Sequence, residues 1–170
     1  MAKRSTDGPA WSVQFLHAMG DIDMQRLDWR QALRVYQQIK ALAPDDEKAR
    51  NMLADLHFRL GQGAAAMAEV DDRLRFHLKQ GQADRAMSLL EELVSQRPDE
   101  VGLRTRLARF YQERGRKGDA IAQLDALGEL QIRAGQTQKA AETIRAILAL
   151  QPDSADSYRR LLAQLESSQS

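Results

Sequence analysis

The sequence predicts an all-α solenoid in which about nine antiparallel helices form three repeats of three helices each. Three of the four prolines, Pro44, Pro98 and Pro152, recur at a constant interval of 54, and each is followed by an aspartate. A fixed interval of this kind indicates a repeat array. Apolar residues within each interval recur at steps of three and four, as in amphipathic helices, and no segment alternates with a period of two.

Other residues repeat at the same interval of 54. The glycine pairs are Gly61 with Gly115 and Gly81 with Gly135, and the alanines on the helix faces are Ala32, Ala86 and Ala140. Apolar positions extend the register back to about residue 10. The sequence therefore predicts a helical repeat domain at 10–166 with repeats at 10–63, 64–117 and 118–166, a flexible leader at 1–9 and a polar tail at 167–170.

Helix boundaries follow from the glycines and the prolines. Glycine accepts the left-handed conformation that ends many helices, so Gly81 and Gly135 end the first helix of the second and third repeats. Each repeated proline ends the second helix, and the aspartate after it offers an acceptor to the amides of the third. The expected helices are 11–26, 29–42, 46–60, 64–80, 83–96, 100–114, 118–134, 137–150 and 154–166.

One stretch carries the motif of a known family. It runs Leu127-Gly128-Glu129-Leu130-Gln131-Ile132-Arg133-Ala134-Gly135-Gln136-Thr137-Gln138-Lys139-Ala140 and continues to Ile144, Ile147 and Pro152. With its Leu-Gly pair, turn glycine, alanine five residues later and closing proline, it resembles a tetratricopeptide repeat (TPR). The step of five from glycine to alanine recurs at Gly61/Ala66, Gly81/Ala86, Gly115/Ala120 and Gly135/Ala140, so the resemblance covers about 10–165.

The turn glycines do not follow the constant repeat length of the family, because a short interval alternates with a long one from Gly61 to Gly135. The alternation is explained if helices 64–80 and 118–134 each belong to two TPR-like pairs. A shared helix needs apolar residues on two sides. In 118–134, one stripe contains Leu124 with Ile121 and Leu127, and a second begins with Ala126, Leu130 and Ala134. The three-helix period of 54 resembles bacterial-type TPR arrays.

Composition excludes several classes of function. The 25 Lys and Arg residues against 24 Asp and Glu give a net charge of +1, which supplies no general attraction to nucleic acid or to an anionic membrane. The absence of cysteine excludes disulfides, a thiolate nucleophile and Cys-based metal sites. Because no apolar run is long enough to span a membrane and the start of the chain is polar, we expect a soluble, cytoplasmic protein.

No pattern of catalytic, cofactor or metal-binding residues stands out, and we expect no enzyme activity. The segment 61–66 fits G-x-G-x-x-A, but a helix precedes it where dinucleotide binding needs a strand, so we interpret it as a turn between helices. The three histidines, His17, His57 and His77, are too far apart in sequence for a helical zinc motif. No serine nucleophile motif or phosphate-loop lysine occurs.

The stretch 104–117, which follows Leu103, is basic. It carries six cations and one acid, and Phe110 and Tyr111 lie between them. Such a stretch could bind phosphates and stack bases, as in an RNA-binding adaptor. It could also form a basic surface for an acidic protein. The third interpretation is ordinary solubility, with the arginines paired to acids such as Asp71, Glu100 and Asp119 and the aromatic residues packed inside.

The resemblance implies a partner-binding groove on the concave face formed by the first helix of each pair. The candidate residues are Lys48, Asn51, Asp55, Arg59, Asp71, Arg75, Lys79, Thr105, Arg109, Gln112, Glu113, Asp125, Glu129 and Arg133. Such a mixed-charge groove could bind an extended or helical peptide. The Lys and Asn set with which some family members bind a chaperone's terminal carboxylate is not reproduced, because Met52 and His17 occupy positions of that set.

The function expected from the resemblance is a non-catalytic protein–protein interaction scaffold or adaptor with a peptide or protein partner. The alternative is a structural self-assembly module, since no repeat precedes the first helix to cover it. Trp11 lies on that helix and could anchor a dimer or a contact with a larger protein. Trp29 precedes the Ala32, Leu33 and Tyr36 stripe, so we expect it to support the core.

Overall fold

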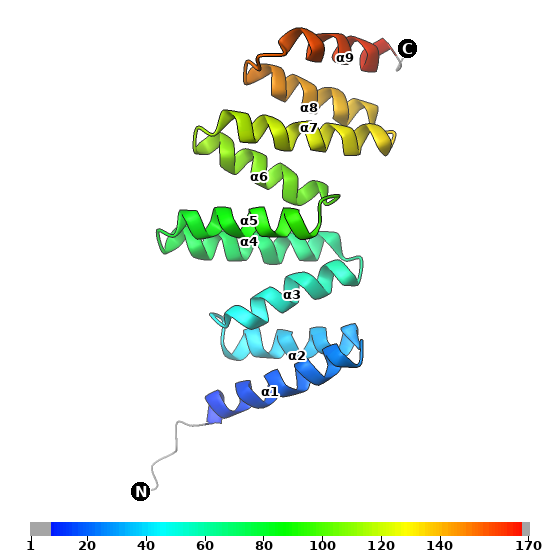
Figure 1. The fold of residues 1–170 in the computed structure, drawn as a ribbon. Helices are drawn as coiled ribbons and strands as arrows, with labels where there is room; N and C mark the ends of the chain where they lie inside the picture. Colours follow the sequence, from blue (N-terminus) through cyan, green and yellow to red (C-terminus); the bar gives the residue numbers. More distant parts are fainter. Residues whose placement is uncertain (1–7, 168–170) are drawn as a thin grey trace, which may run out of the picture. The chain divides into compact units, whose positions relative to one another are not determined.

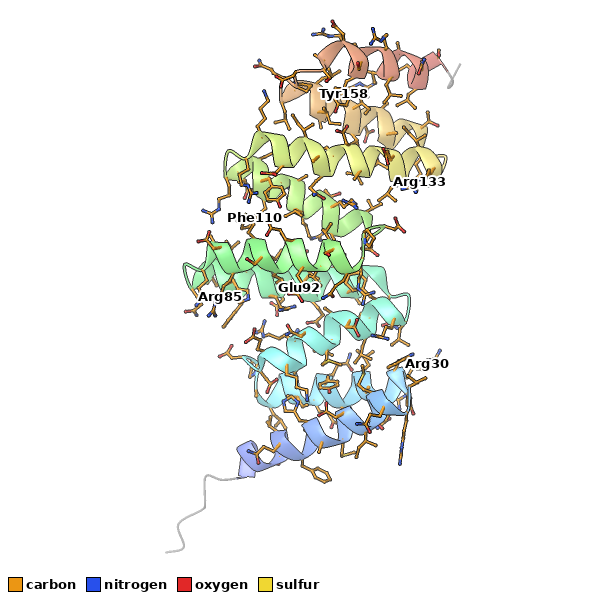
Figure 2. All side chains as sticks on the ribbon, viewed as in Figure 1. Arg30, Arg85, Glu92, Phe110, Arg133 and Tyr158 are labelled. Atoms are coloured by element: carbon orange, nitrogen blue, oxygen red, sulfur yellow. The ribbon has the colours of Figure 1, made fainter. Side chains whose placement is uncertain are left out.

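The computed structural model describes the backbone of residues 8–167 and the side chains of residues 12–167. Across that range the chain forms nine α-helices and no strand (Figure 1), which confirms the predicted all-α helical repeat. Figure 2 shows the described side chains on the same ribbon. The helices are α1 (Gly8–Gln25), α2 (Trp29–Leu42), α3 (Glu47–Arg59), α4 (Gly63–Lys79), α5 (Ala83–Gln96), α6 (Val101–Glu113), α7 (Lys117–Arg133), α8 (Thr137–Ala149) and α9 (Ala155–Ser167).

Most boundaries lie within one or two residues of the expected ones, but α1 begins at Gly8 instead of near residue 11. The expectations for residues 1–7 and 168–170, and for the side chain of Trp11, fall outside the described residues. The helices belong to two compact units that divide between Gln80 and Gly81. The first unit contains α1 to α4 and the second contains α5 to α9.

Within each unit every helix packs against the next one along the chain (Figure 1). In the second unit, α7 contacts both α6 and α8, as predicted for a shared helix. Its buried residues include Leu124 and Leu127, whereas Ala134 is exposed. Ala134 is therefore not part of the second stripe, because it is the cap residue that follows the last turn of α7.

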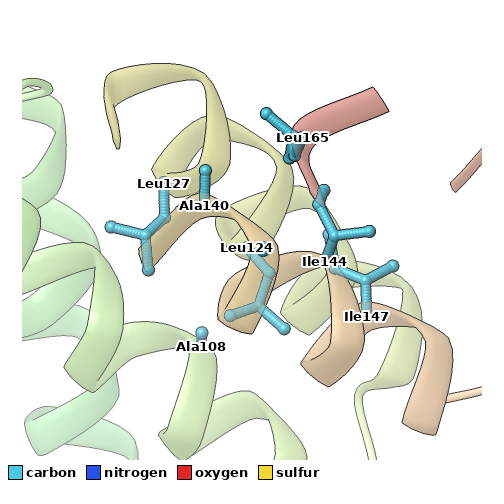
Figure 3. Packing of buried hydrophobic residues seen from close by; sticks show 8 residues of the cluster. Ala108, Leu124, Leu127, Ala140, Ile144, Ile147 and Leu165 are labelled. Atoms are coloured by element: carbon cyan, nitrogen blue, oxygen red, sulfur yellow. The ribbon is translucent and has the colours of Figure 1, made fainter. Parts of the chain in front are cut away.

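Each unit has its own apolar core. In the first unit the core is built on Val35, Ile39, Leu53 and Leu56, and Trp29 packs against it as predicted. The core of the second unit (Figure 3) consists of Ala108, Leu124, Leu127, Ala140, Ala141, Ile144, Ile147 and Leu165. Burying each large aliphatic side chain contributes roughly 1.5–3 kcal/mol to the free energy of unfolding. A single helix pair could not bury these apolar residues by itself, so each core needs several helices.

Small residues set how closely neighbouring helices approach. The repeated alanines Ala32, Ala86 and Ala140 have no exposed surface, which confirms that they are packing positions. The helices approach even more closely at Gly20 on α1, because a Cβ added there would lie 2.8 Å from the ring of Tyr36. At the corresponding place on α7, a Cβ on Gly128 would lie 3.7 Å from Ile144, which is ordinary contact.

The turns between paired helices share one backbone geometry. Gly61, Gly81, Gly115 and Gly135 all have φ near +69°, the left-handed region that glycine adopts without strain. After α3, for example, the amide of Gly61 donates to Phe58 and that of Gln62 donates to His57, the paired bonds of a Schellman cap. The motif ends the helix and sends the chain back alongside it.

The turn between α1 and α2 has the same geometry without a glycine. Leu27 has φ +60°, and Asp28 donates its amide to the carbonyl of Asp23 across the turn. Leu27 precedes Ala32 by five positions and Gly81 by one full repeat interval, so it occupies the glycine position of the repeat. Its side chain is 66% exposed, so packing does not compensate for the left-handed backbone.

In the first two repeats the aspartate that follows the repeated proline does not cap the next helix. In the first repeat the cap is Asp46, whose carboxylate accepts from the amide of Ala49 at 2.7 Å, and not Asp45. In the second repeat the cap residue is Glu100, which makes no side-chain cap bond. The prediction placed the cap one residue early in both repeats, because the turn after the proline takes one residue more than expected.

We predict that Leu27→Gly raises the free energy of unfolding by roughly 0.5–1 kcal/mol. Relief of the left-handed strain, about 1–2 kcal/mol, exceeds the added entropy of glycine in the unfolded chain. Urea denaturation measures the change, and Gly135→Leu is the matched control that should lower stability. A lower urea midpoint for Leu27→Gly would contradict this account of the turn.

Candidate functional site

A charged pocket lies between α3 and α4 of the first unit. It has a volume of about 150 Å³ and is lined by Arg50 from α3 and by Asp72, Arg75, Phe76 and Lys79 from α4. We call these five residues the α3/α4 pocket. Residues 72, 75, 76 and 79 share one face of α4 because three and four residues are close to one helical turn.

Arg50 forms the fixed side of the pocket. Its Nε donates to the carbonyl oxygen of Pro44 at 2.5 Å, Nη1 donates to Asp72 at 3.0 Å, and its guanidinium lies 5.2 Å from the ring centre of Phe76. Only 12% of the side chain is exposed. These contacts hold Arg50 in place and stabilise the turn between α2 and α3.

The same contact occurs in the second unit. Arg104 is the repeat equivalent of Arg50, and it donates from Nε to the carbonyl oxygen of Pro98 at 2.6 Å and from Nη1 to Gln123 at 2.9 Å. An arginine six residues after the repeated proline is therefore a structural element of the array. In the third repeat the equivalent residue is Tyr158, whose hydroxyl instead donates to Asp125 at 2.8 Å.

Positive charge exceeds negative charge around the pocket. Asp72 accepts from Arg50, and its carboxylate also lies 3.6 Å from Lys40 and 3.7 Å from Arg75. Lys40 makes a shorter bond of 2.7 Å to Glu69. With Lys79 included, four cations surround these two carboxylates. Asp71, one residue before Asp72 on α4, adds a third carboxylate, so the group as a whole carries an excess of one positive charge.

Among the cations of the α3/α4 pocket, Arg75 and Lys79 make the fewest contacts with the rest of the fold. The side chain of Arg75 is 68% exposed and holds a 3.7 Å contact with Asp72 and a 3.3 Å bond to the backbone oxygen of Asp71. Lys79 is exposed and has no ion pair in the part of the chain that the structure describes. Both were among the predicted groove residues, and the structure places them at one pocket.

The predicted groove residues of α3 are partly used in internal contacts. Lys48 pairs with Asp21 of α1 at 2.7 Å, and Asp55 pairs with Arg59 at 2.5 Å. The guanidinium of Arg59 also lies 4.9 Å from the ring centre of Trp29. Asn51 is exposed and makes no side-chain hydrogen bond within the described residues.

In the second unit the predicted groove residues fall into two classes. Thr105 donates back to the carbonyl oxygen of Val101, and Asp125 accepts from Tyr158 of α9, so both serve the fold. The exposed members without a side-chain partner among the described residues are Arg109, Gln112, Glu113, Glu129 and Arg133. Arg133 lies at the end of α7 (Figure 2).

Most cations of the basic stretch are bound within the chain. Arg114 pairs with Asp84 and Arg116 with Asp119, each at 2.7 Å. Lys117 and Arg106 donate to backbone carbonyls, and Arg104 donates to Pro98 and Gln123. Tyr111 is buried and Phe110 half-buried, as the solubility interpretation expected, although Asp84 and Glu91 are partners that it did not name.

Polar contacts tie helices together around the tyrosines. The Tyr36 hydroxyl donates to Asp21 and the Tyr111 hydroxyl donates to Glu91. Burial, with the hydrogen bond and charge of the acceptor, raises the pKa of Tyr36 strongly and the pKa values of Tyr111 and Tyr158 to about 12. The pKa of Asp21 is lowered, mainly by the hydrogen bond that its carboxylate accepts from Lys48.

Several of the residues considered for cofactors and metals take part in turns or contacts within the fold. Gly61 of the G-x-G-x-x-A segment has the left-handed turn conformation, and Ala66 is buried. His57 bonds to Gln62 at 2.7 Å, and His17 bonds to Asp46 at 2.8 Å. Among the described residues no cluster of three or more His, Cys, Asp or Glu could hold a metal ion. None of the helices in the described range is both long enough and apolar enough to span a membrane.

Comparison with known proteins agrees with this geometry. Three family models, each described as "Tetratricopeptide repeat", match residues 17–77, 77–129 and 124–154. The chain belongs to the tetratricopeptide repeat family. The third match begins within α7 and covers α8, the pair that carries the motif ending at Pro152. TPR modules in general are non-catalytic and bind proteins.

Several solved structures resemble the chain at low identity. A crystal structure of MamA protein is 14% identical with a TM-score of 0.45, and the match covers 92% of each chain. TTC0263, a thermophilic TPR protein of Thermus thermophilus, is 18% identical with a TM-score of 0.35, covering 90% of this chain and 98% of that one. YrrB, described as a TPR protein with an unusual peptide-binding site, is 15% identical with a TM-score of 0.35, covering 88% of each. No curated protein sequence matches the chain.

Sequence reasoning missed three of the five pocket residues, namely Arg50, Asp72 and Phe76. The recurrence of arginine six residues after Pro44 and Pro98 could have identified Arg50 as an anchored residue. Asp72 and Phe76 carry no comparable signal. They become pocket residues only because α4 presents them toward Arg50, which depends on how α3 and α4 pack.

The hydrogen bond from the Tyr158 hydroxyl to Asp125 can be tested at alkaline pH. A tyrosine in the unfolded chain loses its proton near pH 10, whereas folded Tyr158 keeps it until about pH 12. Its contribution to stability is therefore complete below pH 10 and is lost as the pH rises through 12. We expect Tyr158→Phe to be about 1 kcal/mol less stable at pH 8 and to lose less stability between pH 9 and 11.5. Urea melts across this range measure both, and an unchanged alkaline slope would contradict the assignment.

Proposed function

We propose that this TPR protein is a non-catalytic interaction scaffold that binds a peptide or protein partner through its exposed groove residues. The observation that carries the proposal is the succession of TPR family matches over residues 17–154. A rigid stack of helices presents side chains with little loss of conformational entropy on binding, which favours recognition without a covalent step.

The distribution of engaged and unengaged polar groups supports this proposal. Cations with structural roles, such as Arg50 and Arg104, are anchored on backbone carbonyls and neighbouring helices. Arg75, Lys79 and Arg109 are exposed and only weakly held or unpaired in the described range. Charged groups that the fold leaves free can form charge-assisted hydrogen bonds with a partner.

Self-assembly through the first helix is the second candidate. Phe15 and Ile22, seven residues apart on α1, are 56% and 46% exposed, so they lie on one face of that helix. Packing of this face against a second copy would bury both side chains. Light scattering tests it directly, because self-assembly requires a mass above 19.2 kDa that falls on Phe15→Ser plus Ile22→Ser.

Affinity capture followed by mass spectrometry tests the scaffold function. We expect Arg75→Glu plus Arg109→Glu to lose at least one partner that the wild-type protein captures reproducibly, because both charges are reversed. Arg30→Glu plus Arg34→Glu is the matched control, since both residues are exposed cations of α2 outside the predicted groove (Arg30 is labelled in Figure 2). Identical partner profiles for wild type and the groove variant would argue against the proposed surface.

A further inference from the structure

The α3/α4 pocket differs from the repeat in a way that points to a ligand. Shifting its lining by one repeat interval leads from Arg50 to Arg104, whose contacts with proline and a neighbouring helix are retained. The same shift leads from Asp72 to Ala126, from Arg75 to Glu129 and from Phe76 to Leu130. Lys79 shifts to Arg133, so that position keeps a cation. The array therefore keeps the anchored arginine and the cation at the position of Lys79, but it does not require Asp72, Arg75 or Phe76.

We propose that the α3/α4 pocket binds the side-chain carboxylate of an acidic peptide segment, an inference that rests on the proposed interaction function. Arg75 and Lys79 are the two groups that bind the carboxylate. Arg50 and Phe76 form a fixed wall, because the guanidinium of Arg50 is stacked on the ring and bonded to both Pro44 and Asp72.

Size and charge select this class of ligand. At about 150 Å³ the pocket is smaller than the roughly 300–1,000 Å³ typical of small-molecule sites, so it accommodates the end of a side chain rather than a nucleotide. The planar guanidinium of Arg75 matches the geometry of a carboxylate, and Lys79 adds a second cation. The excess of one positive charge described above favours a monoanion.

The surrounding acids disfavour a nucleic acid. Glu69 and Asp71 lie on α4 one turn or less from the pocket, and Asp72 lies inside it. A phosphodiester backbone needs a continuous row of cations, and along α4 it would meet these carboxylates within one or two phosphates. The backbone of an acidic peptide carries no charge, so the peptide can place one carboxylate on the local pair of Arg75 and Lys79 and keep its other side chains in solvent.

The test uses fluorescence anisotropy with the full chain and a labelled, amino-acetylated and carboxy-amidated hexaglutamate peptide at low salt. We expect binding that weakens about tenfold or more in Arg75→Gln plus Lys79→Gln, because both charge-assisted contacts are removed. Arg30→Gln plus Arg34→Gln makes the same change in net charge on the exposed face of α2 and should weaken binding less than twofold. Circular dichroism checks that both variants are folded.

Two further peptides and one oligonucleotide distinguish a side-chain carboxylate from a terminal carboxylate and from a nucleic acid. Hexaglutamine with an amidated terminus should not bind, and hexaglutamine with a free terminal carboxylate should bind less tightly than hexaglutamate. The inference is overturned if wild type does not bind hexaglutamate, or if both double variants weaken binding equally. It is also overturned if an oligouridylate binds more tightly than hexaglutamate and depends on Arg75 and Lys79.

The two proposals can fail separately. If hexaglutamate does not bind while Arg75→Glu plus Arg109→Glu still changes the captured partners, the carboxylate pocket is wrong and the scaffold function stands. If the peptide binds as expected while the captured partners do not change, the pocket stands and the wider groove is wrong.

Discussion

Close approach of consecutive helices at small residues is the contact on which the fold depends. A left-handed turn residue reverses the chain, and five residues later an alanine with no exposed surface lets the next helix lie against the previous one. The steps from Gly61 to Ala66 and from Gly135 to Ala140 both show this arrangement. A larger side chain at the alanine position would force the helix axes apart and open the core on both sides.

This constraint leaves other positions free to carry function. The cores, the turns and the Arg50 and Arg104 contacts recur, whereas the charges of Asp72 and Arg75 in the α3/α4 pocket do not. The same helical positions that hold Asp72 and Arg75 in the first unit hold Ala126 and Glu129 in the second. The proposed binding chemistry therefore lies on residues that the packing does not need.

The architecture could be predicted from the sequence because its determinants are local and repeated. The constant interval of 54, the glycines and the alanines indicated nine helices and a shared α7, all within the described residues. Side-chain partners could not be predicted in the same way. Asp125 was assigned to a groove but accepts from Tyr158, and Asp72 was overlooked, because each depends on a contact between helices rather than on spacing along one. Leu27 was missed because the pattern identified left-handed turns by glycine alone.

The urea midpoint of Ala140→Leu tests the central claim most directly. Ala140 is fully buried between packed helices of the second unit, whereas Ala146 on the same helix is exposed, so Ala146→Leu adds the same volume outside the core (Figure 3 shows Ala140). The account predicts that Ala140→Leu lowers the free energy of unfolding by about 1–3 kcal/mol and that Ala146→Leu changes it by less than about 0.5 kcal/mol. Equal midpoints for wild type and Ala140→Leu would contradict it.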